Sequence, residues 1–423
     1  MSAALKELPA PASEPLIDAT PVAPTASIAT AKEEKPLELA ALMRKIAADY
    51  GRSPNQQVGE MARLAFGPGK LSMDEYFAMR LFDDQALGAT DKKAFLGLDA
   101  MRKVWMKANH NQEWWGIMRE KLAITALLGA YGFPVIPTLA LYSNSLHLPA
   151  TRMLETRAAL RAFLMEAASY PLFGKPMDEK QSLGTASLTG CDGARGVLKT
   201  IGGEELGLEA YLDTVCERYG QGYIFQQRVQ PHADVRAIAG ERLATVRVMT
   251  ILTRQGPELL RAAWKIPAGR NAADNFWRAG NLLCQLDLVT GTVLRCVSGG
   301  SIGQKEHTVH PDSGAQIAGV KVPMWEALTQ TALSAARVLK DTPLIGWDMA
   351  ATDAGALIVE PNFTPDFILP QIADRRGMMD ERMKAFLAEC EADAKSAKSK
   401  VRKMAVDELK TCLARIARST TGH

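Results

Sequence analysis

The pattern of hydrophobic and polar positions changes character near residue 170. Before it, apolar residues recur at helical spacing from about Leu37, and Ser72 with Glu75 three residues later is typical of a capping box. After it, short runs of Val, Ile, Leu and aromatic residues alternate with Gly, Pro and Asn, which is typical of strands. We therefore predict an α+β protein whose helices come first.

Individual elements follow from the same pattern. We expect a helix that opens at Thr90 or Asp91, and another from about Gln112 to Tyr131 that ends at Gly132. Strands are predicted in six segments: 170–176, 222–229, 244–252, 258–266, 282–288 and 292–297. A helix over 325–339, a last hairpin and one long helical pattern over 377–418 complete the chain.

Composition narrows the class of protein. The 423 residues are 47% hydrophobic, enough for a large core, and no stretch reaches the roughly 18 apolar residues of a membrane span. The net charge of +3 argues against nucleic acid as the main substrate, because phosphate binding needs a clustered basic face. The six cysteines lack metal-type spacing, so we interpret them as reduced thiols of a cytoplasmic protein. Residues 1–36 show no secretory signal and are predicted to form a disordered leader.

The strongest local signal is the hairpin predicted over 346–363. A three-residue turn of Asp353, Ala354 and Gly355 would place Asp348 opposite Glu360, with Asn362 on the same face. Opposed carboxylates repel unless a cation lies between them, and an all-oxygen set suits Mg²⁺. The alternative is a solvated polar hairpin face.

A second signal is a strand that ends in Lys175 and Pro176. The polar loop after it contains Ser182, Gly184 and Thr185, so an ammonium and backbone N–H groups could meet phosphate oxygens. The loop is not a Walker A motif. The alternative is an ordinary junction between a strand and a loop.

Two further strands carry unusual polar residues. One ends at Gln227 and has Asp234 seven residues on, an arrangement that could offer hydrogen bonds to a purine and a carboxylate to ribose. The alternative there is an edge strand with solvated glutamines. The other strand carries Arg247 among apolar residues, and burial of an arginine requires a partner. A phosphate or carboxylate ligand would serve, with Lys265 nearby, but so would a structural ion pair.

The order of these signals, preceded by Lys121 on a helix before GFPVIPT, resembles the ATP-grasp superfamily over about residues 118–370. The blocks TVRVMT, AADNFWRAGN, HPDSG, KVPMW and GWDMA resemble its sugar-transfer-associated branch, which is linked to alpha-L-glutamate ligase-like proteins. The resemblance implies two α+β lobes that clasp ATP, preceded by helices and followed by a helical arm. It divides the chain into a disordered leader (1–36), a helical N-terminal region (37–110), a linker helix with the first lobe (111–230), the second lobe with the metal hairpin (231–370) and the arm (371–423).

Site roles are implied residue by residue. Lys121 and Lys175 resemble the lysines on the ATP phosphates, and the segment with Ser182, Gly184 and Thr185 resembles the lid over them. The segment that binds adenine is matched by Gln227, Arg228, Val229 and Gln230, and the acid that binds ribose by Asp234. Asp348, Glu360 and Asn362 resemble the ligands of two Mg²⁺ ions, with Glu360 bridging the two ions. Arg247 and Lys265 resemble the basic residues near the γ-phosphate and the acyl phosphate. Three features depart from the family pattern: a glutamine at 227 instead of a carboxylate, Gly346 instead of an arginine, and one clear glycine in the lid.

The activity implied is ADP-forming ligation of a small carboxylate to an amine through an acyl phosphate. The alternatives are a phosphotransferase that acts on a small molecule or sugar, and a non-catalytic nucleotide-binding protein.

In the arm, Met383, Leu387, Cys390 and Ala394 begin a heptad-like stripe that would suit a homodimer. Packing of the arm against the body, or a basic surface arm, would produce the same pattern.

Overall fold

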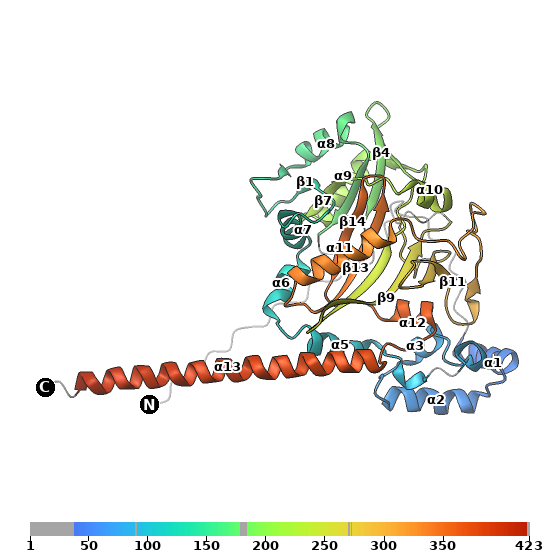
Figure 1. Ribbon diagram of the computed structural model, residues 1–423. Coiled ribbons are helices and arrows are strands. Elements are labelled where there is room, and N and C mark those ends of the chain that lie inside the picture. Colours follow the sequence, from blue (N-terminus) through green and yellow to red (C-terminus); the bar gives the residue numbers. More distant parts are fainter. Residues whose placement is uncertain (1–37, 89–90, 178–183, 270, 272, 421–423) are drawn as a thin grey trace, which may run out of the picture.

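Two seven-stranded sheets organise the protein, as a computed structural model that describes residues 38–88, 91–177, 184–269, 271 and 273–420. The first sheet lies in the upper part of Figure 1 and has the order β2-β1-β7-β3-β4-β5-β6. Most of its neighbouring strands are antiparallel, whereas β1 and β2 are parallel. Its strands are β1 (Thr138–Tyr142), β2 (Arg152–Leu154), β3 (Leu172–Pro176), β4 (Ala186–Asp192), β5 (Val197–Thr200), β6 (Glu205–Gly207) and β7 (Tyr223–Gln227), and α8 (Arg157–Met165) and α9 (Leu208–Asp213) accompany them.

The second sheet is antiparallel, with the order β12-β11-β10-β9-β8-β13-β14. One face buries apolar residues such as Val248 and Trp264 against α11 (Trp325–Val338), and the other packs Leu283 and Val297 against α12 (Ile368–Asp374) and the N-terminal helices. The strands are β8 (Val246–Thr253), β9 (Gly256–Ile266), β10 (Leu282–Leu286), β11 (Val293–Ser298), β12 (Lys305–Glu306), β13 (Leu344–Thr352) and β14 (Gly355–Asn362). The predicted α+β class is confirmed.

The N-terminal region is helical, as predicted, and Ser72 with Glu75 forms the expected capping box. Two expected helices differ from the structure. The one predicted to open at Thr90 or Asp91 is a short 3₁₀ turn, and the α-helix begins only at Leu98, after Gly97; Thr90 lies outside the described residues. The helix predicted over 112–131 is two helices that meet at Glu120. The region contains α1 (Leu39–Tyr50), α2 (Pro54–Phe66), α3 (Met73–Ala78), α4 (Asp84–Leu87), η1 (Lys92–Ala94), α5 (Leu98–Ala108), α6 (Glu113–Arg119) and α7 (Lys121–Ala130).

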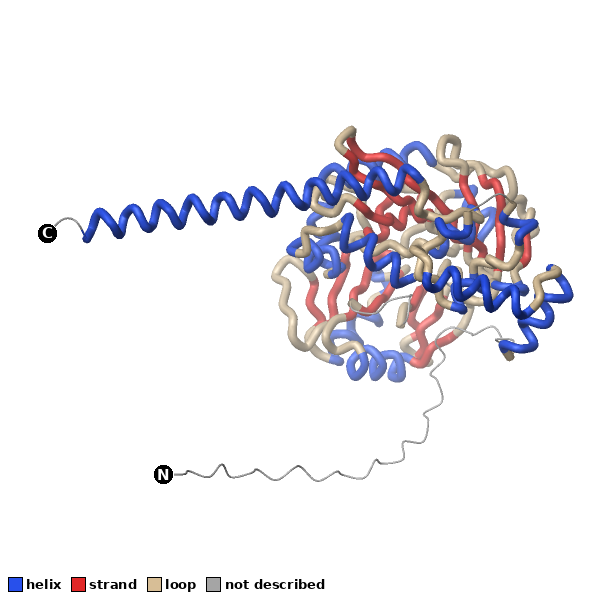
Figure 2. The backbone as a smooth tube through the Cα atoms, turned by 90° about the horizontal axis from the view of Figure 1, so that it is seen from below, coloured by secondary structure: helices blue, strands red, loops and turns tan. Residues whose placement is uncertain are grey.

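The chain ends in a single helix, α13 (Glu381–Thr420), which projects from the body in Figure 1 and again when the molecule is seen from below in Figure 2. Its first turns pack Met383, Phe386 and Cys390 beside α5 in the core, so the start of the heptad-like stripe contacts the body. Val406 and Leu409 farther along are exposed, and the homodimer stays a prediction. In the part of the chain that the structure describes, no helix is both long and apolar enough to cross a membrane.

Candidate active site

The hairpin of β13 and β14 brings Asp348 directly opposite Glu360, as predicted, although the turn differs from the prediction. Thr352 pairs with Gly355, so the turn has two residues instead of three, and Gly355 adopts a φ of 120° that favours glycine. A bulge between the Asp348 and Met349 pairings then adds one residue, Val359, to β14. The bulge shifts the register by one and restores the predicted pair of carboxylates.

Asp348 is held by two basic residues, one on the adjacent strand β8 and one on β9, the strand beyond it. Arg247 lies opposite it on β8 and donates Nε and Nη2 to its two carboxylate oxygens at 2.8 and 2.9 Å, and Lys265 Nζ on β9 lies 3.1 Å from Oδ1. Burial alone would raise the pKa of Asp348, but the Arg247 and Lys265 charges outweigh it and hold this pKa well below its ordinary value. Asp348 is therefore a permanent carboxylate. Arg247 forms a structural ion pair with it, which is the alternative that the sequence left open for this arginine.

Two further acids belong to this cluster and were given no site role from the sequence. Asp274 lies 3.8 Å from Lys265 and accepts hydrogen bonds from the N–H and hydroxyl of Thr245. Asp366 follows β14; burial raises its pKa, although the Ile368 N–H, 2.7 Å away, and the Arg247 charge oppose the rise. The Pro365–Asp366 dipeptide signals only a turn, so strand alternation had no means of placing Asp366 beside Arg247.

Three groups in the same region lack partners. Within the described ranges, Glu360, Asn362 and Lys175 make no side-chain hydrogen bond or ion pair, and the Asn362 Nδ2 is fully buried. All three side chains are partly buried. Because unpaired polar groups are costly to bury, this arrangement suits a ligand that would satisfy them.

Lys175 is the last residue but one of β3 and lies near Glu360 of the other sheet. Burial lowers the pKa of Lys175 to about 8; the Glu360 carboxylate opposes this shift and the ammonium of Lys121 adds to it. Lys121 begins α7, where the Glu120 carboxylate caps the helix, and its Nζ donates to the Pro176 carbonyl at 3.4 Å. The two lysines selected from the sequence therefore lie together with the acid from the hairpin.

The predicted lid lies mostly outside the described residues, and Ser182 with it. At its end, Gly184 has a φ of 69°, and its carbonyl accepts a hydrogen bond from the Tyr223 hydroxyl at 2.9 Å. A Cβ at this position would lie 2.4 Å from the Tyr219 hydroxyl, so only glycine fits. Thr185 follows directly, at the start of the chain into β4. Gly184, which was predicted to contact phosphate, is therefore also required by its backbone conformation and by the nearby Tyr219 side chain.

The segment predicted for adenine follows β7. The Arg228 N–H donates to the Pro171 carbonyl, and the Gln230 carbonyl accepts from Asp353 in the hairpin turn. Among the described residues, Val229 makes no backbone hydrogen bond. Gln227 is exposed, and Asp234 lies on the first turn of α10 (Ala233–Ala239) with its side chain 72% exposed. Their roles stay predictions.

The residues fit a nucleotide-bound divalent cation better than a closed metal cage. The described residues contain no group of three His, Cys, Asp or Glu side chains that could hold a metal ion by themselves. Mg²⁺ usually takes one or two carboxylates and completes its shell with water and substrate phosphates. Glu360 and the Asn362 Oδ1, beside Asp348, can supply these one or two protein ligands.

The comparison with protein-family models agrees with the motifs. The family model described as sugar-transfer associated ATP-grasp matches residues 212–386, which confirms the resemblance to the ATP-grasp superfamily. No curated protein matches the chain. Among solved structures, the D-alanine–D-alanine ligase of Bacillus anthracis has a TM-score of 0.38 at 13% identity and covers 67% of this chain and 70% of its own. The enzyme of the same name from Coxiella burnetii has a TM-score of 0.39 at 13% identity, with 69% and 62% covered. The ATP-grasp ligase PsnB with its minimal precursor has 0.34 at 15%, with 67% and 64% covered.

Proposed function

We propose that this chain, an ATP-grasp protein through residues 212–386, is an ATP- and Mg²⁺-dependent ligase. It would activate a small carboxylate as an acyl phosphate and couple it to an amine, with release of ADP and phosphate. The observation that carries the proposal is the set of unpaired groups, Glu360, Asn362 and Lys175, beside the ion pairs of Asp348 with Arg247 and Lys265. A metal-bound triphosphate offers a cation to the Glu360 carboxylate and the Asn362 Oδ1, and phosphate oxygens to the Asn362 Nδ2 donor and the Lys175 ammonium.

Charge balance supports two metal ions. The described site residues include four basic and four acidic side chains, which sum to zero: Lys121, Lys175, Arg247 and Lys265 against Asp274, Asp348, Glu360 and Asp366. ATP with two Mg²⁺ ions is also neutral, so it would enter without leaving uncompensated charge in a partly buried site. One ion alone would leave two negative charges to be neutralised elsewhere.

Each residue then has a distinct task. Asp348, Glu360 and Asn362 would hold Mg²⁺, which neutralises phosphate oxygens when bound. Lys175 and Lys121 would bind those oxygens from the first lobe. Arg247 uses Nε and Nη2 on Asp348, which would leave Nη1 to bind a substrate oxygen and stabilise charge that develops during acyl transfer.

Hydroxylamine trapping tests this function. We expect wild-type protein with ATP, Mg²⁺, hydroxylamine and a panel of carboxylates to form a hydroxamate and ADP in equal amounts. Lys175→Met should abolish both products, whereas Lys199→Met, at an exposed lysine on β5 of the same lobe, should keep them. ADP formed with a hydroxyl acceptor and no hydroxamate would favour the phosphotransferase. ATP binding without turnover of any carboxylate would favour the non-catalytic alternative.

ATP affinity should fall as the pH rises through the pKa of Lys175. With a pKa of about 8, the ammonium is mostly charged at pH 7 and mostly neutral at pH 9, so affinity should weaken about tenfold between these values. The ligand-free protein should show the opposite trend. The unfolded lysine keeps its proton to higher pH than the folded one, so the free energy of unfolding rises with pH over this window.

Calorimetric titration of Mg–ATP from pH 7 to 9 measures the first trend, and urea unfolding measures the second. Lys175→Arg keeps its charge and should bind with little pH dependence, while Lys175→Met should lose the rise in stability. A wild-type affinity that is constant over this range, with Lys175→Arg equally constant, would contradict a role for the Lys175 charge in nucleotide binding.

A further inference from the structure

Two cysteines lie directly opposite each other in the second sheet, outside the proposed active site. Cys284 is the middle residue of β10, and Cys296 on β11 pairs with it across the antiparallel contact of these strands. Both residues are buried in the core, with 0% and 2% of their surface exposed. Opposite residues of an antiparallel pair project from the same face of a sheet, so the two thiols share one site in the core that packs against α11.

The backbone determines how close the two side chains come. The Cys296 carbonyl accepts a hydrogen bond from the His307 N–H at 2.9 Å, on the side of β12. The N–H and C=O of a strand residue point to the same side, so Cys296 directs both groups away from Cys284. The two cysteines therefore form a non-hydrogen-bonded pair, in which Cα atoms lie about 4.5 Å apart and side chains are closest. Because a disulfide needs Cα atoms roughly 4.4–6.8 Å apart, it could close here without a shift of either strand.

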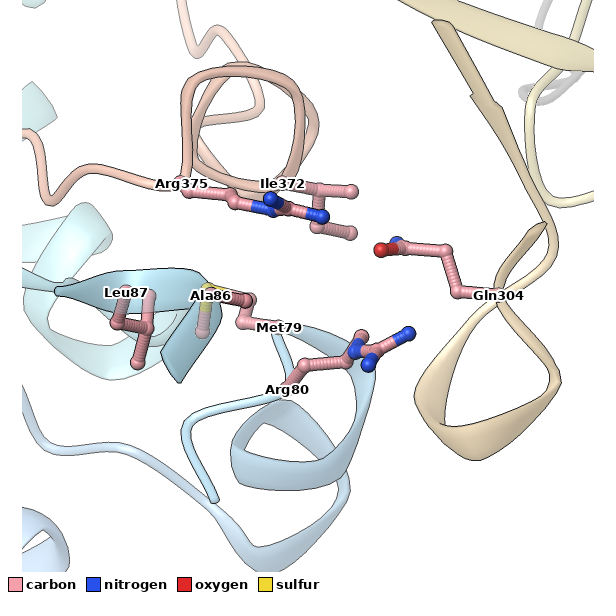
Figure 3. Close-up of a pocket in the computed structure, with 7 residues that line it drawn as sticks. All are labelled: Met79, Arg80, Ala86, Leu87, Gln304, Ile372 and Arg375. Carbon is pink, nitrogen blue, oxygen red and sulfur yellow. The ribbon is translucent and has the colours of Figure 1, made fainter. Parts of the chain in front are cut away.

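Contacts on the opposite face of this hairpin hold the strand that carries Cys296 in place. Arg295, the preceding residue, donates to the Ile372 carbonyl at 2.9 Å and to the Gln304 Oε1 at 3.0 Å. Figure 3 shows Gln304, from the connection between β11 and β12, directed toward Ile372 and toward Arg375 at the end of α12. The register of β11 is therefore fixed from outside the cysteine pair.

The two thiols react slowly as long as they stay buried. Burial raises the pKa of Cys284 well above its ordinary value, and the neighbouring Cys296 thiol adds to this rise. The thiolate is the species that attacks a disulfide, so reaction requires local opening of the sheet. Opening is easiest at an edge: β12, the strand beyond β11, consists of two exposed residues.

We propose that Cys284 and Cys296 are a modification site, at which a small-molecule disulfide such as oxidised glutathione converts the two thiols into a cross-strand disulfide. One cysteine attacks the small disulfide and releases the first small thiol, and the other cysteine then displaces the second. The S–S bond of the oxidant is replaced by an S–S bond in the protein, two electrons pass to the oxidant, and the protons of the two cysteines end on the two small thiols. A reducing compartment returns the pair to thiols, as the sequence predicts for this protein.

The disulfide should stabilise the native protein. It would join the two strands of the β10–β11 hairpin and close the chain from residue 284 to residue 296. A closed loop of this length restricts the unfolded chain, and for a protein of this size we expect Tm to rise by about 2–4 °C. Dithiothreitol should return Tm to the reduced value.

Peptide mapping tests the site. Full-length protein is incubated with oxidised glutathione below its Tm, its remaining thiols are alkylated, and it is digested with trypsin. Cleavage after Arg278, Arg295 and Lys305 places the two cysteines in separate peptides, 279–295 and 296–305. We expect these two peptides to be recovered as one disulfide-linked species, which forms faster as the temperature approaches Tm.

Variants locate the effect. Cys284→Ala and Cys296→Ala should each lose the linked species and the rise in Tm on oxidation, relative to their own baselines. Cys390→Ala is the matched control and should behave as wild type does. Cys390 is also buried, with 5% exposed and a pKa raised by burial, but it lies on α13.

Three results would overturn the proposal. One is oxidation of other cysteines in the native protein without the linked peptides. Another is a stable glutathione adduct on Cys284 or Cys296 in place of the link. The third is a linked protein whose Tm is lower than that of the reduced form, because the native strands would then not fit the disulfide. ATP turnover plays no part in this test, so failure of the proposed ligase function would leave its outcome unchanged.

Discussion

Replacement of Arg247 by methionine should lower the free energy of unfolding by about 3 kcal/mol. The Arg247 side chain is 11% exposed and that of Asp348 is 13% exposed, so loss of the guanidinium leaves a nearly buried carboxylate with Lys265 as its remaining cation. Urea denaturation at pH 7 measures the effect. Arg254→Met is the control, because Arg254 and Asp393 also lie 2.8 Å apart but are more than half exposed, and its loss should cost less than about 0.5 kcal/mol.

The pH dependence of the Arg247→Met defect identifies its cause. Asp348 has a folded-state pKa below its unfolded value, so its ion pairs stabilise the protein above the unfolded pKa, and this stability is lost as the pH falls toward the folded value. The difference between wild type and variant should therefore be largest near pH 7 and shrink below about pH 4. A defect of the same size at pH 3 and pH 7 would indicate lost packing instead of a lost ion pair.

The ion pair shows what strand-by-strand reasoning can and cannot supply. The position of Arg247 in the middle of an apolar strand predicted that it needs a partner, and Asp348 was selected independently as a ligand. Their contact depends on β8 lying next to β13, a neighbour 101 residues away in sequence. Hydrophobic alternation predicts which residues share a face of one strand, but it contains no information about the order of strands in a sheet.

The pairing of Asp348 with Glu360 was predicted correctly for a reason that the sequence pattern did not contain. Alternation and Gly355 suggested a three-residue turn, whereas the structure has a two-residue turn and a bulge at Val359. The two differences cancel at Asp348 and Glu360. A bulge leaves no regular trace in the pattern of hydrophobic residues, so a prediction from spacing alone would have failed beyond the turn had the bulge lain elsewhere.

The predicted helix boundaries were wrong where the sequence signals for a helix start were weak. The pattern from Gln112 to Tyr131 is continuous in hydrophobicity, yet Glu120 interrupts it and caps α7 by accepting from the N–H groups of Leu122 and Ala123. Glutamate is a rare N-cap, so it did not mark a helix start. The break matters for the site, because it places Lys121 at the first turn of α7, close to the end of β3.

Glu360→Gln should reduce ATP turnover by at least about a hundredfold, which corresponds to roughly 2.7 kcal/mol in the barrier. The substitution keeps the shape of the side chain but removes the charge that would hold Mg²⁺ opposite Asp348. It also removes the carboxylate that counters the lowered pKa of Lys175, so this lysine should lose its proton more readily and bind phosphate less well near pH 8. Steady-state ADP release measures the first effect.

Stability separates a metal ligand from a structural acid at this position. Glu360 makes no hydrogen bond or ion pair with a described residue, so Glu360→Gln should unfold within about 1 kcal/mol of wild type in the absence of ligand. The rise in Tm that Mg–ATP produces in wild type should be absent from the variant. Glu258→Gln, on β9 and paired with Arg382 at the surface, should keep both the rise and the turnover. A Glu360→Gln protein that is markedly less stable yet fully active would make Glu360 a structural residue and would contradict the proposal that the hairpin binds Mg²⁺.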